Sequence, residues 1–422
     1  MRCYLDKCGL VLFIVLSLTA SGCASFNPRP IDQVPFKARA QTKSENNVRV
    51  TAAVLSAEEA KAVFDLDLYK KGIQPIWIEI ENNDEERVWF APVGVDRDYF
   101  SPLEVAYMHH RSFSKETNYR IDKYLHEQGI RGHIEPGRVK SGFVFAYLDL
   151  GTKIVNVDLV GEDHDIRTFT FFISVPGLKV SYADVDFEKL YPKDEIVSCE
   201  DEEDLRKALE GLPCCSTNAD GTERADPLNL IVIGNGRTIH RALIRSGWDE
   251  TGSTEKFLGI TEQYRYTPVS PFYLYGRRQD AAFRKTRKTA DERNHVRFWL
   301  SPISYKGKQV WVGQISRDIK VRYLLGIFRI EPAVDEARSY ILQDLWYSQT
   351  LAKFGYVKGV GAASMSNPRK TLQDDPYFTD GYRLVLWVSR KPVSFSEVEV
   401  LDWEVRPLKK KDLLDNHPHA VR

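Results

Sequence analysis

Alternation of apolar and polar residues along short segments is the feature that most restricts how this chain can fold. From Ile76 to Ile80 every second residue is isoleucine, which predicts a strand with one buried face. Similar strands are expected at 48–55, 141–150, 154–161 and 169–175, and helices at 56–64 and 101–129. Ser56 and Glu59 supply a capping box for the first helix. The spacing of the strands predicts an immunoglobulin-like antiparallel β-sandwich with helical insertions over residues 48–183.

Residues 226–392 mix helices and strands instead. The apolar run "PLNLIVIG" at 227–234 predicts a strand that is buried on both faces. Further strands are expected at 272–275, 294–300, 309–315 and 382–389, and helices at 238–248 and 332–353. We therefore predict an α+β domain here and the α+β class for the whole chain. Residues 184–225 are predicted as a charged linker with one short helix, and residues 393–422 as a last strand and a tail.

The first 22 residues have the organisation of a bacterial lipoprotein signal peptide. A basic start precedes the apolar stretch 9–20, which suits a signal-peptide core and is short for a membrane span. Small residues then lead to Cys23 and resemble a lipobox, although Ala20 stands where Leu or Val is usual. The resemblance implies cleavage before Cys23 and diacylation of its thiol. The alternative is an ordinary secretory signal followed by a chance cysteine.

An acylated Cys23 would set the location of the protein. Each buried methylene of an acyl chain contributes about 0.8 kcal/mol, and two chains give stable anchoring. Ala24 and Ser25 follow, with no Asp at the next position, which resembles sorting to the outer membrane in two-membrane bacteria. We expect a palmitate-type lipid anchor, a mature chain in the cell envelope facing the periplasm, and a flexible tether over the polar residues 23–47.

Three cysteines remain beyond the predicted anchor. An oxidising compartment favours pairing of Cys199 with Cys214 or Cys215. Such a bridge closes a loop of about fifteen residues and contributes about 3 kcal/mol in the chain-entropy model. A metal site is the less favoured alternative, because no histidine or fourth cysteine is near in sequence. We predict no metal and no cofactor.

Positive charge is concentrated in residues 270–300, although the formal net charge of the chain is zero. In the predicted strand "NHVRFWL", His295, Arg297 and Trp299 share one face and apolar residues occupy the other. An arginine beside an aromatic ring suits a phosphate, a carboxylate or a sugar acid. The alternative is a solvated loop whose bases pair with nearby acids. The candidate binding residues are Arg277, Asp280, Arg297, Trp299, Arg317 and Asp318, and the candidate general base is His295.

Several segments, in order, resemble the LssY-like C-terminal domain over about residues 199–390. They are "LPCCSTNADGTERADPLNLIVIG", "SPFYLYGRRQDAAFRKTR", "NHVRFWLSP", "VWVGQISRD" and "IEPAVDEAR". The family often has a histidine shortly before the last of these, where this chain has Phe328, Arg329 and Ile330. The resemblance implies a fold and no particular reaction. Some larger relatives join this domain to regions that resemble lipid-phosphate phosphatases, but after Ser316-Arg317-Asp318 the phosphatase histidine is missing here.

Two functions fit these observations. The first is a non-enzymatic module of the envelope that binds a protein partner or an anionic lipid or glycan. The second is a hydrolase or transferase acting on an envelope lipid or glycan, with His295 as the base. Nucleic acid is not an expected partner, because 59 basic residues are balanced by 59 acidic ones and a secreted protein rarely meets nucleic acid.

The lipid anchor can be tested directly. We expect a Cys23→Ser variant to lose palmitate labelling and to leave the membrane fraction, because no acyl chain can then be attached. A Ser25→Cys control, which keeps Cys23, should fractionate like the wild type. Unchanged fractionation of Cys23→Ser would contradict the anchor.

Overall fold

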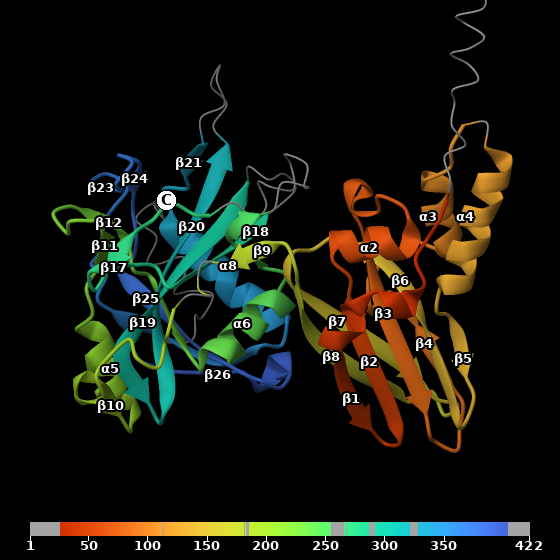
Figure 1. Ribbon diagram of the computed structural model, residues 1–422. Coiled ribbons are helices and arrows are strands. Elements are labelled where there is room, and N and C mark those ends of the chain that lie inside the picture. The colour runs from red at the N-terminus through yellow and green to blue at the C-terminus, as the bar shows by residue number, and fades with distance from the viewer. Residues whose placement is uncertain are drawn as a thin grey trace, which may run out of the picture. The chain divides into compact units, whose positions relative to one another are not determined.

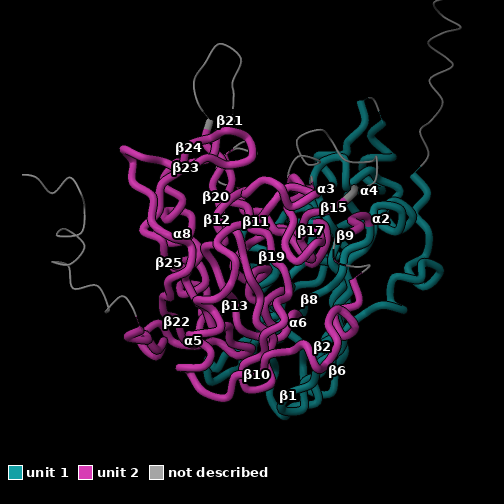
Figure 2. The backbone as a smooth tube through the Cα atoms, turned by 90° about the vertical axis from the view of Figure 1, so that its left-hand side faces the viewer, with its two compact units in different colours: residues 1–149, 153–176 teal, residues 150–152, 177–422 magenta. Residues whose placement is uncertain are grey.

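The computed structural model describes residues 26–112, 114–180, 182, 185–254, 266, 268–286, 292–320 and 328–403 of the 422-residue chain (Figure 1). The predicted signal peptide and Cys23 lie outside these residues, as does the end of the chain. Two compact units are present: residues 1–149 with 153–176, and residues 150–152 with 177–422 (Figure 2). Strands predominate over helices and several sheets contain antiparallel pairs, so the predicted α+β class is confirmed.

Unit 1 contains two four-stranded sheets, with the orders β1-β2-β3-β6 and β5-β4-β7-β8. The strands are β1 Gln41–Glu45, β2 Val48–Val54, β3 Ile73–Asn82, β4 Val88–Ala91, β5 Gly132–Ile134, β6 Arg138–Tyr147, β7 Gly151–Val160 and β8 Ile166–Val175. The helices are α2 Ala57–Phe64, α3 Pro102–Met108 and α4 Lys115–Gln128. Every strand and helix predicted in this region is present, and the capping box of Ser56 and Glu59 begins α2.

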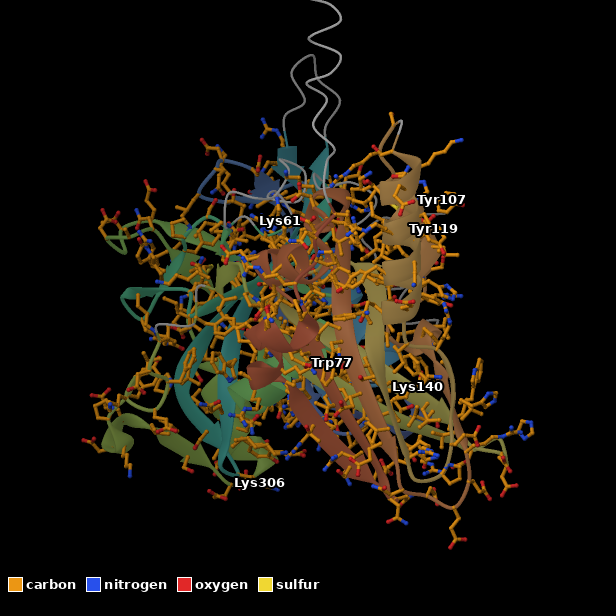
Figure 3. The ribbon with its side chains drawn as sticks, turned by 45° about the vertical axis from the view of Figure 1, so that its right-hand side comes forward. Lys61, Trp77, Tyr107, Tyr119, Lys140 and Lys306 are labelled. Atoms are coloured by element: carbon orange, nitrogen blue, oxygen red, sulfur yellow. A yellow bond between two sulfur atoms is a disulfide. The ribbon has the colours of Figure 1, made fainter. Side chains whose placement is uncertain are left out.

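The segment that we predicted as a flexible tether is ordered over its described part. Residues 26–47 form two short 3₁₀ helices, Ile31–Gln33 and Pro35–Arg39, followed by β1. Phe36 is fully buried, and its ring lies 5.9 Å from that of Trp77 on β3. Trp77 is labelled in Figure 3. Trp77, which the alternation assigned to the polar face, is therefore covered as well. A few apolar residues anchor a segment whose average composition is polar.

Unit 2 is built on a ten-stranded sheet with the main order β14-β18-β19-β20-β13-β25-β22-β26; β10 pairs with β19, and β21 with β20. The strands are β10 Val197–Cys199, β13 Leu230–Ile233, β14 Asp249–Glu250, β18 Ala281–Thr286, β19 Arg293–Tyr305, β20 Lys308–Lys320, β21 Phe328–Ile330, β22 Leu351–Lys358, β25 Tyr382–Val388 and β26 Glu399–Val400. As predicted, β13 is buried along its whole length, between parallel β25 and antiparallel β20.

Three helices and a second sheet cover the two faces of this large sheet. On one face lie α5 Glu202–Glu210 and a small sheet of β12 Arg224–Pro227, β11 Cys215–Thr217, β16 Tyr273–Leu274 and β17 Arg277–Arg278. The other face packs against α6 Gly236–Arg245 and α8 Val334–Tyr347. Two short pairs, β9 Leu178–Val180 with β15 Gly252–Thr254 and β23 Arg369–Lys370 with β24 Pro376–Tyr377, complete the unit. Both faces of β19 and β20 are therefore covered.

The helix predicted at 332–353 ends earlier than expected. It stops at Tyr347, Gln349 adopts the left-handed conformation with φ 59°, and β22 begins at Leu351. Strands β18 and β22 were not predicted. The sequence of β22, "LAKFGYVK", is rich in the apolar and aromatic residues that favour strands, and pairing with β25 outweighs its weak helical pattern.

Residues 184–225 are not a linker, because they contribute to the core of unit 2. Strand β10 runs parallel to β19, and Leu205 and Leu209 of α5 are fully buried. The acids at the start of α5 lie near the positive end of the helix dipole, and Asp201 caps the helix. Two leucines four residues apart suffice to dock a helix whose other residues are mostly charged.

Arg383 on β25 holds this region to the sheet. Its side chain is fully buried, and it donates hydrogen bonds of 2.5–3.1 Å only to backbone carbonyl oxygens. The five acceptors belong to Leu209, Leu212, Pro213, Leu228 and Gly359. Burial lowers the pKa of Arg383 to about 10, so the guanidinium stays charged at neutral pH.

The predicted disulfide of Cys199 is wrong. Cys214 pairs with Cys215, its neighbour in sequence, and Cys199 is a free buried thiol. Cys199 lies on β10 within the apolar core beside α5, where burial raises the pKa of its thiol. The sequence favoured a bridge from Cys199 to one of the two later cysteines, but β10 directs the Cys199 side chain into the apolar core.

Loss of the Arg383 guanidinium should destabilise the protein strongly. We expect Arg383→Met to lower the free energy of unfolding by about 3 kcal/mol or more, because several buried carbonyl groups lose their donor. Arg390→Met, at an exposed position, is the control and should change it by less than about 0.5 kcal/mol. Urea unfolding followed by tryptophan fluorescence measures both. Equal stability of the two variants would contradict this role.

Candidate functional site

A pocket of about 220 Å³ lies in unit 2 where β18, β19, β20 and β21 meet the chain at 269–272 and 373–375. We call it the arginine pocket. Its ionisable lining residues are Arg284, Arg293, His295, Arg297, Asp318, Arg329 and Asp375. Four arginines and a histidine face two carboxylates, so positive charge predominates in the lining.

Strand register explains why these residues converge. Arg284 of β18 pairs with His295 of β19, which pairs with Ser316 of β20. In the neighbouring rows, Arg297 pairs with Gln314 and Arg293 with Asp318. Side chains two residues apart on a strand share a face, so the three rows place their polar groups together.

Arg297 is the most unusual residue of the arginine pocket. It is 3 % exposed, its Nε donates to the carbonyl oxygen of Ser270 at 3.1 Å, and its Nη1 donates to Gln314 at 2.5 Å. The guanidinium lies 4.2 Å from the ring centre of Phe272. In the described part of the chain, no acidic side chain forms a salt bridge with it and its Nη2 makes no hydrogen bond. Burial lowers its pKa to about 10, so it remains a cation at neutral pH.

His295 lies between a hydroxyl group and a carboxylate. Its Nε2 is 2.8 Å from the Oγ of Ser316, and its Nδ1 is 3.4 Å from Asp318. Burial lowers the pKa of His295, against the opposing effect of Asp318, so the ring is neutral at neutral pH. Burial alone would raise the pKa of Asp318, but His295 and Arg293 together lower it to about 2. This order of groups is also that of serine hydrolases.

Ser316 differs from an accessible nucleophile in its surroundings. It is 1 % exposed, it does not line the arginine pocket, and its Oγ accepts a hydrogen bond from Gln314 at 2.9 Å. Ser316 pairs with His295 within the β19–β20 ladder. The row of Ser316, His295 and Asp318 therefore acts as a hydrogen-bonded support that orients the polar face of the sheet.

Asp226 of β12 carries the least satisfied carboxylate near the pocket. It is 1 % exposed, and its Oδ2 accepts from Gln314 at 3.3 Å. Its buried Oδ1 has no hydrogen-bond partner among the described residues. Burial raises the pKa of Asp226 to about 7, although Arg297 opposes the shift. This group therefore titrates near neutral pH.

Arg277 and Asp280 lie outside the arginine pocket and bind each other. Two nitrogens of Arg277 meet the two oxygens of Asp280 at 2.9 and 3.0 Å, and Asp280 also accepts from the backbone N–H of Leu300 at 2.7 Å. The guanidinium stands over the rings of Tyr191 and Tyr275. This bidentate pair connects β17 to β19.

Trp299 and Arg317 also take structural positions. Trp299 is fully buried in the core beneath α5, so its ring does not reach a ligand. Arg317 projects on the opposite face of β20 from His295, where it donates to Asn294 at 2.9 Å and Glu331 at 3.0 Å. Of the seven candidates, the pocket thus contains His295, Arg297 and Asp318.

Sequence reasoning assigned no role to Gln314, Ser316, Arg329, Asp226 or Asp375. The sequence did contain a signal for Gln314 and Ser316, because together with Asp318 they place a polar residue at every second position of a strand. In a strand covered on both faces, such a polar series indicates a buried polar face. Asp226 and Asp375 come from segments distant in sequence and gave no such signal.

The titration of Asp226 can be tested. Its folded-state pKa of about 7 lies above the ordinary value of 3.8, so the folded protein holds this proton more tightly between those pH values. Its contribution to stability therefore decreases as pH rises through that window. Asp226→Asn imitates the neutral acid, so we expect its stability relative to wild type to rise from about pH 5 to about pH 8 in urea unfolding. Asp194→Asn, at an exposed site, is the control; a pH-independent difference for Asp226→Asn would contradict the assignment.

No metal-binding group of three or more His, Cys, Asp or Glu side chains occurs within the described ranges. Likewise, none of the helices described there is long and apolar enough to cross a membrane.

No curated protein sequence matches the chain. A protein-family model described as the LssY C-terminus matches residues 205–382, a range that includes all the lining residues of the arginine pocket. The match confirms the resemblance predicted from the sequence: unit 2 carries an LssY C-terminal domain.

Proposed function

We propose that this protein is a lipid-anchored, non-enzymatic binding module of the bacterial cell envelope. Its LssY C-terminal domain would bind an anionic group, of the phosphate, carboxylate or sugar-acid type, in the arginine pocket. The observation that carries this proposal is Arg297, a buried cation that forms no salt bridge in the described part of the chain, although Asp226 and Asp318 act on it electrostatically. A buried charge is expensive unless it is paired, so a bound anion would stabilise it.

The surroundings of Arg297 support an anion. Arg284 and Arg293 line the same pocket, and Arg329 lies half-exposed beside it with its guanidinium 2.6 Å from Asp375. Stacking on Phe272 and bonds to Ser270 and Gln314 hold the plane of the Arg297 guanidinium. A fixed guanidinium loses little freedom when it binds an oxyanion, which favours affinity.

Unit 1 fits the role of a spacer between the anchor and the binding domain. Its two four-stranded sheets are compatible with the immunoglobulin-like sandwich that we infer for it. Acylated Cys23 would attach the chain to the outer membrane of a two-membrane bacterium, facing the periplasm. Its partners would be the membrane, through the anchor, and an anionic lipid or glycan or an envelope protein that bears such a group.

A hydrolase or transferase acting on an envelope lipid or glycan is the second candidate, and the row of Ser316, His295 and Asp318 is the observation in its favour. One feature makes it the less supported proposal. The Oγ of Ser316 is buried outside the pocket lining, so a substrate in the arginine pocket would not reach it.

Anion binding can be tested with inorganic phosphate, succinate and glucuronate as probes. We expect at least one of them to raise the melting temperature of the wild-type protein and to bind in calorimetry. Arg297→Gln should weaken that binding about tenfold or more, because a charge-assisted pair is lost. Arg278→Gln removes the same charge at an exposed position outside the arginine pocket and should bind as the wild type does.

A second variant covers the case in which Arg297→Gln does not fold. Arg329→Gln changes a half-exposed residue of the pocket lining and should reduce affinity while the melting temperature without ligand is kept. Absence of binding for all three anions, or equal binding by wild type, Arg297→Gln and Arg329→Gln, would overturn the proposed site.

A further inference from the structure

A second cavity, of about 350 Å³, lies in unit 2 on the other face of the strands that form the arginine pocket. Alternation along the strands separates the two sites. Ala281 and Phe283 of β18 and Phe298 of β19 line this cavity, whereas Arg284 and Arg297 line the arginine pocket. The cavity and the arginine pocket share no lining residue, so each can have its own ligand.

The cavity is lined mainly by aromatic rings. They belong to Tyr182, Phe187, Phe283, Phe298 and Trp311. Phe187 and Trp311 meet edge to face at 5.2 Å, and Ile239 of α6 adds an aliphatic side chain. Small apolar cavities of about 150 Å³ stay dry and bind benzene, and ligand pockets usually begin near 300 Å³. A hydrocarbon chain or a ring system fits this volume and lining.

A buried carboxylate outside the lining contacts two of the lining residues, His240 and Tyr182. Glu250 is 2 % exposed, and its Oε1 lies 2.8 Å from the Nε2 of His240 and also accepts from the hydroxyl group of Tyr182. Burial would raise the pKa of Glu250, but its bonds to His240 and Tyr182 lower it overall, so it is ionised at neutral pH. This fixed carboxylate sets the orientation of the His240 ring.

The second ring nitrogen of His240 is the group left for a ligand. Nε2 is engaged by Glu250, whereas Nδ1 makes no hydrogen bond with any residue in the described ranges. His240 lines the cavity, and so does Arg237, one residue into α6. The buried Nε1–H of Trp311 likewise has no acceptor in the described part of the chain. These groups would be matched by an acceptor oxygen, and a carboxyl group pairs with imidazole in either of its protonation states.

We propose that this cavity binds an apolar monocarboxylic acid, whose hydrocarbon part lies among the aromatic rings and whose carboxyl group meets Arg237 and Nδ1 of His240. The mostly apolar lining, the presence of Arg237 and His240 in it, and the lack of an acid among the lining residues all favour such an amphipathic ligand. The site shares no lining residue with the arginine pocket, so it stands or falls separately from the function proposed above.

Decanoate and its uncharged counterpart 1-decanol test the proposal by calorimetry on the mature chain. We expect decanoate to bind with one-to-one stoichiometry and a negative heat-capacity change, the sign of apolar burial. Ala281→Leu fills the cavity and should abolish binding of both compounds. Arg237→Gln should weaken decanoate about tenfold and leave 1-decanol unchanged, whereas Arg241→Gln, one turn further along α6 and outside the lining, should change neither.

The outcomes are decisive in both directions. If decanoate fails to bind the wild type, or if Ala281→Leu and Arg237→Gln bind it as the wild type does, the cavity is not this site. Phosphate binding, measured in parallel on Ala281→Leu, shows whether the arginine pocket and the fold are intact. A failure at one site is thereby distinguished from a failure at the other.

Discussion

Burial of both faces of β18, β19 and β20 is the constraint on which unit 2 depends. A strand sends successive side chains to opposite faces, so a strand covered on both sides must match two environments at once. Around the arginine pocket one set of alternate residues is polar and meets the segments around Ser270, Asp226 and Asp375. The other set is apolar where it meets α6 and the aromatic rings around it. Two chemically different pockets result from one pair of hydrogen-bonded ladders.

The polar face is held together by mutual satisfaction of its groups. Gln314 contacts Arg297, Ser316 and Asp226, and thereby connects three rows of side chains. Removal of any one member leaves buried groups unpaired, which is destabilising. Such a network positions Arg297 and His295 rigidly, but it also hides the hydroxyl group of Ser316. The contacts that hold Arg297 in place thus also keep this hydroxyl group away from solvent.

Much of the fold could be predicted from local patterns. Strands β2, β3, β6, β7, β8, β13, β19, β20 and β25 were anticipated, since alternation or a continuous apolar run marks each of them. Residues 26–47 and 184–225 were misjudged, because average composition hides the few apolar side chains, such as Phe36 and Leu205, that dock them. Pairing of Cys214 with Cys215 could not be derived from spacing, since the direction of the Cys199 side chain decides it.

The candidate site was predictable only within single strands. His295 and Arg297 share a face as expected, and Asp318 joins them because the β19–β20 register places it there. Arg317 is one residue away from Asp318 and consequently points to the opposite face. Arg277 and Asp280 are neighbours that satisfy each other, so neither is left for a ligand. Partners such as Asp226, distant in sequence, require tertiary structure to be found.

Arg383 also determines how far the LssY C-terminal domain extends. Its carbonyl acceptors include Leu209, Leu212 and Pro213, which all precede β12. A shortened polypeptide that began at residue 226 would contain the cation but lack most of the oxygens that solvate it, and the gap would open in the middle of the core. Autonomous folding of this domain thus requires the chain from α5 onward, so its physical boundary lies upstream of β12.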